Sequence, residues 1–232
     1  MLEAVAMGAQ WKHRIRQASA TARGRAFTKL TKELIMAAKA GADPSTNARL
    51  RAAIETAKKA SMPRDTLERA IKKGAGQLES EHYETVVYEG FGPHRVPVMV
   101  ECLTDNTKRT TTNIRHIFRH GQLTPVAWDF EHVGIVDAGA EADPEEAAIE
   151  CGAQDFEPDP EHGVRFYTNP TDLDAVAKAL SGRGWAVATM RLGWRAKNPV
   201  KLEDAARPEV EAFLTELDED DDVQHIYVGL DG

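Results

Sequence analysis

The spacing of apolar residues changes once along this chain, near Tyr83. Before that point apolar residues recur every three to four positions, which is the period of amphipathic helices. After it come short apolar or alternating runs, separated by glycine and proline, which are typical of strands. No apolar run reaches the roughly 18 residues that a membrane helix needs. The sequence therefore predicts an all-helical segment followed by mixed strands and helices, with no membrane span.

Four helices are predicted before residue 80. Apolar spacing from Trp11 predicts the first, and Gly24 interrupts that pattern, so the run over 27–38 is predicted as a separate second helix. Asn47 has a side chain suited to cap the start of a third helix, and Pro63 suits the first position of a fourth. These helices would form a small domain with a basic surface.

Strands and helices alternate in the rest of the chain. Strands are predicted at 84–89, 96–102, 126–130, 132–137, 155–157, 164–167, 186–192 and 223–228, and helices at 110–119, 144–151, 172–180 and 208–217. The order over 132–192 is that of the ferredoxin-like motif. The predicted fold class is therefore α+β, with an N-terminal all-helical domain followed by two ferredoxin-like α/β domains, the first discontinuous around the second. The predicted domains are residues 1–79, residues 80–131 with 198–232, and residues 132–197.

Charge is divided unevenly between these parts. Residues 1–79 hold 16 Lys and Arg against 7 Asp and Glu, whereas residues 80–232 hold 13 against 30, and the whole chain has a net charge of -8. This asymmetry indicates an anionic partner for the basic part, above all nucleic acid. Two alternatives stay open, namely a solvated helical surface with excess lysine and a basic transit peptide for mitochondria.

The sequence offers little for catalysis or metal binding. Cys102 and Cys151 make neither a disulfide framework nor a zinc site, which fits a reducing compartment and predicts a cytoplasmic protein. His116 and His120 are four apart, but the glutamate of the HExxH motif is missing. No catalytic triad or carboxylate pair is evident, so we expect no enzyme activity, no cofactor, no metal and no small-molecule substrate.

Cationic side chains at helical positions suit contacts with phosphates, because each neutralised phosphate releases condensed counterions. The residues predicted to contact nucleic acid all lie in the basic helical segment: Lys12, His13, Arg14, Arg16, Arg23, Arg25, Lys29, Arg49, Arg51 and Arg64. The alternative is that some of them pair with Glu33, Glu55 or Glu68 on the helix surfaces.

A second candidate site lies where a strand is followed by a helix, over 104–110. Free backbone N–H groups at such a junction, with Lys108 and Arg109 beside them, could hold an anion, so Asn106, Lys108 and Arg109 form a candidate anion site. The alternative, which the lack of a glycine-rich phosphate motif favours, is that Asp105 or Asn106 only caps the helix.

The chain also resembles the YebC family of bacterial proteins, which includes probable transcriptional regulators of the YebC/PmpR type and is related to the mitochondrial translational activator of cytochrome c oxidase subunit one. The resemblance runs from about Gly8 to the end. Its motifs are FTKL at 27–30, NARLRAAI at 47–54, MPRDTLERAIKKG at 62–74, YEGFG at 88–92, LTDNTKRT at 103–110, VAW at 126–128 and DDDVQHIY at 220–227. Two stretches depart from the family pattern: GAQWKHRIR at 8–16 is shortened, and so is the loop at 120–125.

The resemblance implies a helical domain followed by two α/β domains, no known catalytic activity, and a cytoplasmic role in gene expression. Three functions are compatible with it and with the charge pattern. The first is a DNA-binding transcriptional regulator, and the second is a ribosome-associated translation factor that binds ribosomal RNA. The third is a protein adaptor that uses the acidic α/β domains. The expected partner is DNA or ribosomal RNA, with the ribosome included.

Overall fold

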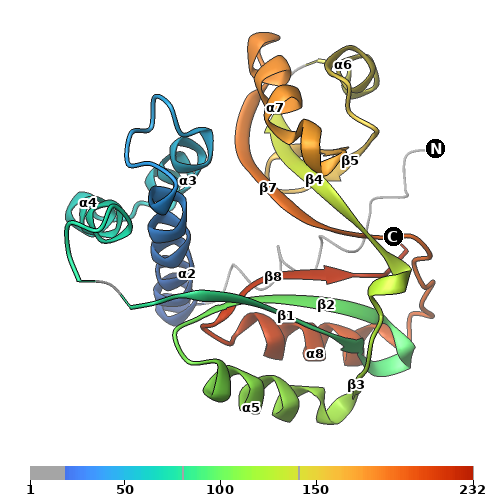
Figure 1. The fold of residues 1–232 in the computed structure, drawn as a ribbon. Coiled ribbons are helices and arrows are strands. Elements are labelled where there is room, and N and C mark those ends of the chain that lie inside the picture. The colour runs from blue at the N-terminus through green and yellow to red at the C-terminus, as the bar shows by residue number, and fades with distance from the viewer. Residues whose placement is uncertain (1–18, 80, 141, 232) are drawn as a thin grey trace. The chain divides into compact units, whose positions relative to one another are not determined.

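The structure is a computed structural model that describes residues 19–79, 81–140 and 142–231 (Figure 1). Its contacts group the chain into two compact units. One unit contains residues 81–131 and 194–231, together with the start of the first described helix as far as Arg25. The other contains residues 26–79 and 132–193.

The helical segment consists of α2 (Ser19–Lys39), α3 (Ala48–Lys59) and α4 (Arg64–Gly74). Helix α2 continues through Gly24, so the predicted break at this glycine is wrong. A glycine inside a helix costs about 1 kcal/mol relative to alanine, which twenty other helical residues can offset. The buried side of α2 includes Leu34 and Ile35, and Leu50 is buried on α3.

Side-chain and backbone caps define both ends of α3. The Asn47 carboxamide accepts a hydrogen bond from Leu50 N at 3.0 Å, as its position predicted, and it donates to Ala37 O at 2.8 Å. At the other end Ser61 N donates to Lys58 O and Met62 N donates to Ala57 O, each at 2.9 Å. These two bonds form a Schellman motif, with Ser61 in the left-handed position at φ 60°.

Gly74 lets α4 approach α2 closely. A Cβ at this position would lie 2.3 Å from the backbone oxygen of Ile35 and 2.6 Å from the Cβ of Ala38. Both distances are far below van der Waals contact, so only glycine fits at this crossing. The two helices therefore pack backbone against backbone at the end of the MPRDTLERAIKKG motif.

The first sheet has the strand order β3-β1-β2-β8. Its strands are β1 (Glu84–Phe91), β2 (Pro97–Thr104), β3 (Gln122–Leu123) and β8 (Val223–Val228), and each pairs antiparallel with its neighbours. Helices α5 (Thr107–Ile117) and α8 (Arg207–Asp218) lie on one side of this sheet (Figure 1). Their shared core contains Val98 and Val100 of β2, and the rings of Phe118 and Phe213 meet edge to face at 5.1 Å.

The strand predicted at 126–130 is not formed. Residues Ala127–Asp129 make a 3-10 turn, and β4 begins only at Phe130. The carboxylate of Glu89 accepts hydrogen bonds from Val126 N and Ala127 N, both at 2.7 Å. Because these amides are bonded to a side chain, they are not available for a strand ladder.

The second sheet has the strand order β5-β6-β4-β7. Its strands are β4 (Phe130–Gly139), β5 (Asp155–Asp159), β6 (Gly163–Thr168) and β7 (Ala186–Ala196), with helices α6 (Pro144–Cys151) and α7 (Leu173–Gly182) between them. This succession and strand order are those of the ferredoxin-like fold. Val136, Phe166 and Leu180 share a core with Trp185, whose ring meets Phe166 edge to face at 5.0 Å.

The predicted α+β fold class is confirmed. A helical segment precedes two four-stranded α/β domains, and residues after the second domain supply α8 and β8 to the first. The predicted domain boundaries at residues 79, 131 and 197 stay a prediction. Among the helices that the structure describes, none is long and apolar enough to cross a membrane.

Candidate nucleic-acid interface

Exposed cations on α3 are the best-defined part of the predicted interface. Arg49 and Arg51 are both exposed, and within the described chain their guanidinium groups make no ion pair or hydrogen bond. The stripe of Leu50, Ala53 and Ala57 is buried, and the two arginines lie on either side of it. Their charges are therefore not neutralised by neighbouring carboxylates.

Other predicted cations have carboxylate partners. Arg25 on α2 contacts Glu219 at 3.0 Å, and its side chain is 27% exposed. Arg64 at the start of α4 contacts Glu68 at 2.7 Å, one helical turn along, but its side chain is 89% exposed. An exposed pair at this spacing contributes little to stability, so a phosphate can compete for Arg64 more easily than for Arg25.

The remaining predicted residues are less defined. Lys12, His13, Arg14 and Arg16 lie outside the described residues. Arg23 belongs to α2, and Lys29 is a partly buried residue of the same helix. The structure therefore brings together only part of the predicted set.

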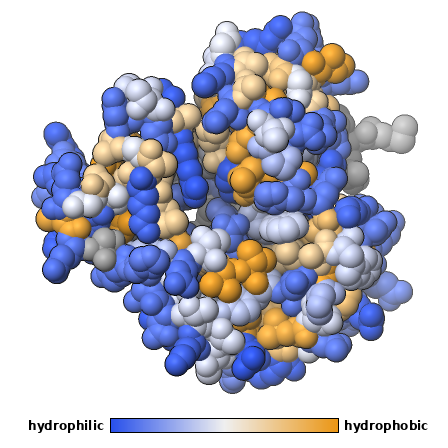
Figure 2. All heavy atoms as spheres, viewed as in Figure 1, coloured by the Kyte–Doolittle hydropathy of each residue, from blue (hydrophilic) through white to orange (hydrophobic). Residues whose placement is uncertain are grey.

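Further cations of the same kind, which the sequence pattern did not single out, lie on these helices. Within the described chain, four more exposed side chains of α2, α3 and α4 make no ion pair: Lys39, Lys59, Arg69 and Lys72. On α4, Arg69 and Lys72 are three residues apart and so lie next to each other, opposite the buried Leu67. Their spacing relative to the apolar stripe was a signal that could have identified them. Figure 2 shows hydrophilic residues over much of α3 and α4 on the visible face.

The candidate anion site at the start of α5 is filled by groups of the chain itself. Asn106 caps the helix, accepting a hydrogen bond from Arg109 N at 3.1 Å. Arg109 Nη2 donates to Asp222 Oδ2 and to Asp105 Oδ1, each at 2.8 Å. Lys108 is exposed. The arrangement matches the capping alternative, with the guanidinium used for an internal ion pair.

The electrostatics of this junction agree with its geometry. The hydrogen bonds that Arg109 donates to Asp222 and then to Asp105 raise the pKa of its guanidinium above its ordinary value. Thr110 Oγ1 also donates to Asp222 Oδ2, at 2.8 Å. The motifs LTDNTKRT and DDDVQHIY thus meet in space, and their shared role is to join the start of α5 to the start of β8.

A second buried charge cluster, which sequence analysis missed, crosses the ferredoxin-like sheet. Asp137 of β4 is 2% exposed and accepts hydrogen bonds from Arg165 Nε at 2.7 Å and from Arg191 Nη1 at 2.8 Å. Burial acts to raise the pKa of Asp137, but the charges of Arg191 and Arg165 outweigh it and hold that pKa well below its ordinary value. The sequence signal that could have identified this cluster was the acidic Asp137 in a predicted apolar strand.

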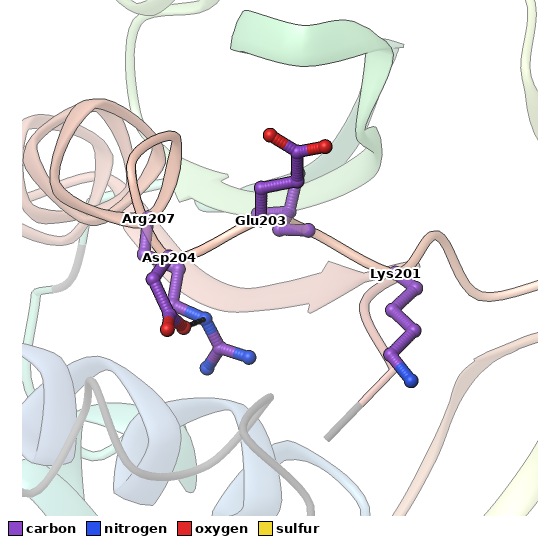
Figure 3. Close-up of a pocket in the computed structure, with 5 residues that line it drawn as sticks. Lys201, Glu203, Asp204 and Arg207 are labelled. Atoms are coloured by element: carbon purple, nitrogen blue, oxygen red, sulfur yellow. Dashed lines mark ion pairs between the residues drawn. The ribbon is translucent and has the colours of Figure 1, made fainter.

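An open hollow of about 550 Å³ lies on the segment between β7 and α8. Its lining includes Lys201, Glu203, Asp204 and Arg207 (Figure 3). Arg207 Nε contacts Asp204 Oδ1 at 3.1 Å. Both signs of charge line the hollow, so it does not add a second cationic surface. In the described part of the chain, no group of three or more His, Cys, Asp or Glu side chains could hold a metal ion.

Comparison with known proteins assigns the family. Residues 8–77 match the TACO1/YebC protein N-terminal domain, and residues 83–230 match the TACO1/YebC second and third domain. The chain belongs to the TACO1/YebC family. The resemblance found in the sequence motifs is therefore confirmed.

Relatives within the TACO1/YebC family match over nearly the whole chain. A protein of Pseudomonas syringae pv. syringae is 58% identical over 97% of this chain and 100% of its own length. One from Bdellovibrio bacteriovorus is 47% identical over 95% of this chain and 99% of its own length. Both carry the name "probable transcriptional regulatory protein". A crystal structure of a conserved hypothetical protein from Aquifex aeolicus superposes with a TM-score of 0.80, at 40% identity and 90% coverage of both chains.

Proposed function

We propose that this TACO1/YebC-family chain is a non-enzymatic regulator of gene expression that binds nucleic acid, and that its helical segment binds the phosphates. One observation carries the proposal: within the described chain, several exposed cations of α2, α3 and α4 make no ion pair, namely Lys39, Arg49, Arg51, Lys59, Arg69 and Lys72. Such cations release condensed counterions when they contact phosphates, which supplies most of the affinity for a polyanion.

The negative charge of the α/β domains is compatible with this proposal. The Debye length at physiological salt is about 8 Å, so carboxylates farther than that from the contact surface are largely screened. Arg49 and Arg51 therefore interact with a phosphate mainly through their own local field. The names of the relatives support a role in transcription. For that role we propose promoter DNA as the ligand.

A charge-removal series tests the proposal. We expect Arg49→Ala with Arg51→Ala to weaken DNA binding at low salt and to reduce the slope of log affinity against log salt by about 0.9 for each phosphate that is no longer neutralised. The matched control is Lys178→Ala with Lys201→Ala, which removes the same charge from exposed positions outside the helical segment. That control should leave the slope unchanged.

Two results would contradict the proposed surface. One is an equal loss of affinity in both double variants, because net charge alone would then explain binding. The other is an unchanged salt slope in the Arg49 and Arg51 variant when circular dichroism shows an intact fold. Adding the Arg14→Ala and Arg16→Ala changes extends the same test to the start of the chain.

Crosslinking in cells identifies the ligand. Covalently attached nucleic acid would be recovered with the intact protein and sequenced. Promoter DNA supports the proposed role in transcription, whereas ribosomal RNA from one locus would make the protein a ribosome-associated translation factor. Recovery of neither would favour the protein adaptor. The cytoplasmic location expected from the sequence stays a prediction.

A further inference from the structure

Trp128 is an exposed aromatic side chain on a firmly held turn. It lies in the 3-10 turn Ala127–Asp129, and 66% of it is exposed. The other large hydrophobic side chains that are exposed in the described chain are aliphatic: Leu78, Val87, Leu123, Ile149 and Leu192. An exposed indole ring leaves a large apolar surface in contact with water.

Hydrogen bonds hold the turn in place both before and after Trp128 in the sequence. Before it, Glu89 accepts hydrogen bonds from Val126 N and Ala127 N. After it, Asp129 is 5% exposed and accepts a hydrogen bond from Asn198 Nδ2 at 2.7 Å. Because the backbone is already held in place, the protein loses little conformational entropy when a ligand stacks on the ring.

The ring has no polar group left for a ligand. Indole has one hydrogen-bond donor and no acceptor, and Trp128 Nε1 donates to Pro125 O at 3.2 Å. The exposed part of the side chain therefore offers apolar ring surface. A flat aromatic partner gains most by stacking on the face of such a ring.

A lysine ammonium group contacts the backbone of Trp128. Lys197 is exposed, and its ammonium group donates to Trp128 O at 3.0 Å. An ammonium group has three donors, so this bond leaves two for a ligand. An aromatic ring with an adjacent positive charge could bind a nucleotide, because the ring can stack on the base and the ammonium group can contact the phosphate.

We propose that Trp128 is a stacking platform for an unpaired base of a nucleic-acid strand, with Lys197 contacting a phosphate of the same strand. The inference rests on the proposed function, because it assumes a nucleic-acid ligand. It adds a contact outside the helical segment and a preference for unpaired over paired bases. In a duplex both faces of an internal base are stacked on neighbours, so Trp128 cannot reach them without unstacking the helix.

The test compares one strand in two states. Binding of single-stranded oligodeoxyadenylate and of the same strand annealed to oligodeoxythymidylate is measured by fluorescence anisotropy, using the full chain. Stacking on an aromatic side chain is worth about 1–3 kcal/mol per base, so Trp128→Ala should weaken single-strand binding about 5- to 150-fold. Duplex binding should change little.

Two further variants separate stacking from other effects. Trp128→Phe keeps an aromatic face and should retain most of the single-strand affinity, but the quenching of tryptophan emission by the oligonucleotide should decrease, since only the other three of the four tryptophans remain. Ile149→Ala is the matched control, because it removes an exposed apolar side chain elsewhere, 74% exposed on α6, and should have no effect.

The outcomes distinguish this inference from the proposed function. If the arginine variants of α3 lose affinity while Trp128→Ala binds single strands as well as the original chain does, the platform is wrong and the cationic surface stands. If Trp128→Ala weakens duplex and single strand equally, selectivity for unpaired bases is wrong. If the unaltered chain binds neither ligand at low salt, both proposals fail.

Discussion

Arg109 on α5 and Asp222 before β8 form an ion pair across 113 residues of sequence. The guanidinium donates from Nη2 at 2.8 Å and from Nε at 3.3 Å. The side chain of Asp222 is only 4% exposed, whereas that of Arg109 is 47% exposed. The arginine therefore compensates a buried carboxylate, and the pair attaches the last strand of the first sheet to the helix that follows β2.

We predict that Arg109→Ala lowers the free energy of unfolding by about 3 kcal/mol, because it leaves Asp222 buried without its charged partner. Urea denaturation measures this change. A double-mutant cycle with Asp222→Ala should return a coupling energy of about 0.5–3 kcal/mol. If Arg109→Ala left stability unchanged but abolished phosphate binding, the anion-site hypothesis would be correct instead.

We predict that Asp137 makes the free energy of unfolding fall at acidic pH. Its pKa is lowered in the folded state, so its contribution is complete above the ordinary pKa of about 3.9 and is lost as the pH falls from there toward the lower folded value. Asp137→Asn should cost about 3–5 kcal/mol near neutral pH and flatten the acid dependence. Urea denaturation at a series of pH values measures both effects.

A variant at an exposed carboxylate serves as the control for Asp137→Asn. Asp174→Asn removes an exposed charge from the first turn of α7 and should cost no more than about 1 kcal/mol. Equal pH dependence in the original chain and the Asp137 variant would show that the two arginines do not hold that carboxylate ionised.

We predict that serine at position 61 makes the protein less stable than glycine would. It occupies the left-handed position that ends α3, where a side chain is strained, and it is exposed. Ser61→Gly should raise the free energy of unfolding by about 0.5–1 kcal/mol, since relief of strain exceeds the entropy that glycine adds to the unfolded chain. Ser45→Gly should be destabilising, because Ser45 Oγ donates to Asp43 at 2.8 Å. The measurement is the thermal midpoint, and a lower midpoint for Ser61→Gly would refute the assignment.

Two glycines are predicted to respond to alanine with opposite signs. At Gly24 an added Cβ would meet no atom within 4 Å among the described residues, apart from its chain neighbours and the backbone of its own helix, so Gly24→Ala should stabilise α2 by about 0.8–1 kcal/mol. At Gly74 the added Cβ would overlap the backbone of Ile35, so Gly74→Ala should destabilise by about 1–3 kcal/mol. Urea denaturation of both variants checks the signs. Stabilisation by both changes would mean that α2 and α4 do not cross closely.

Apolar periodicity predicted most helices and strands because each of them buries one face. It failed where distant residues decide the local structure. Val126 and Ala127 look like strand residues, but Glu89, 37 residues away, binds their amides. Gly24 looks like a helix end, yet α2 continues through it.

The same limit applies to the candidate sites. Spacing along a helix identified Arg49 and Arg51 as outward-facing, because their position follows from the buried stripe of the same helix. It could not show that Arg25 contacts Glu219, which is 194 residues away. Long-range ion pairs of this kind decide which cations stay available to a ligand.

The late position of β8 in the chain affects how the protein is made. Residues that pair β2 with β8, such as Cys102 and Val223, lie more than a hundred positions apart, and the second α/β domain is synthesised between them. At about 5–20 residues per second, Asp222 is added about 6–23 s after Arg109. Throughout that interval one edge of β2, an almost fully buried strand in the finished fold, has no neighbour. Newly made chains therefore pass through a stage in which an apolar strand edge is open to aggregation or to a chaperone.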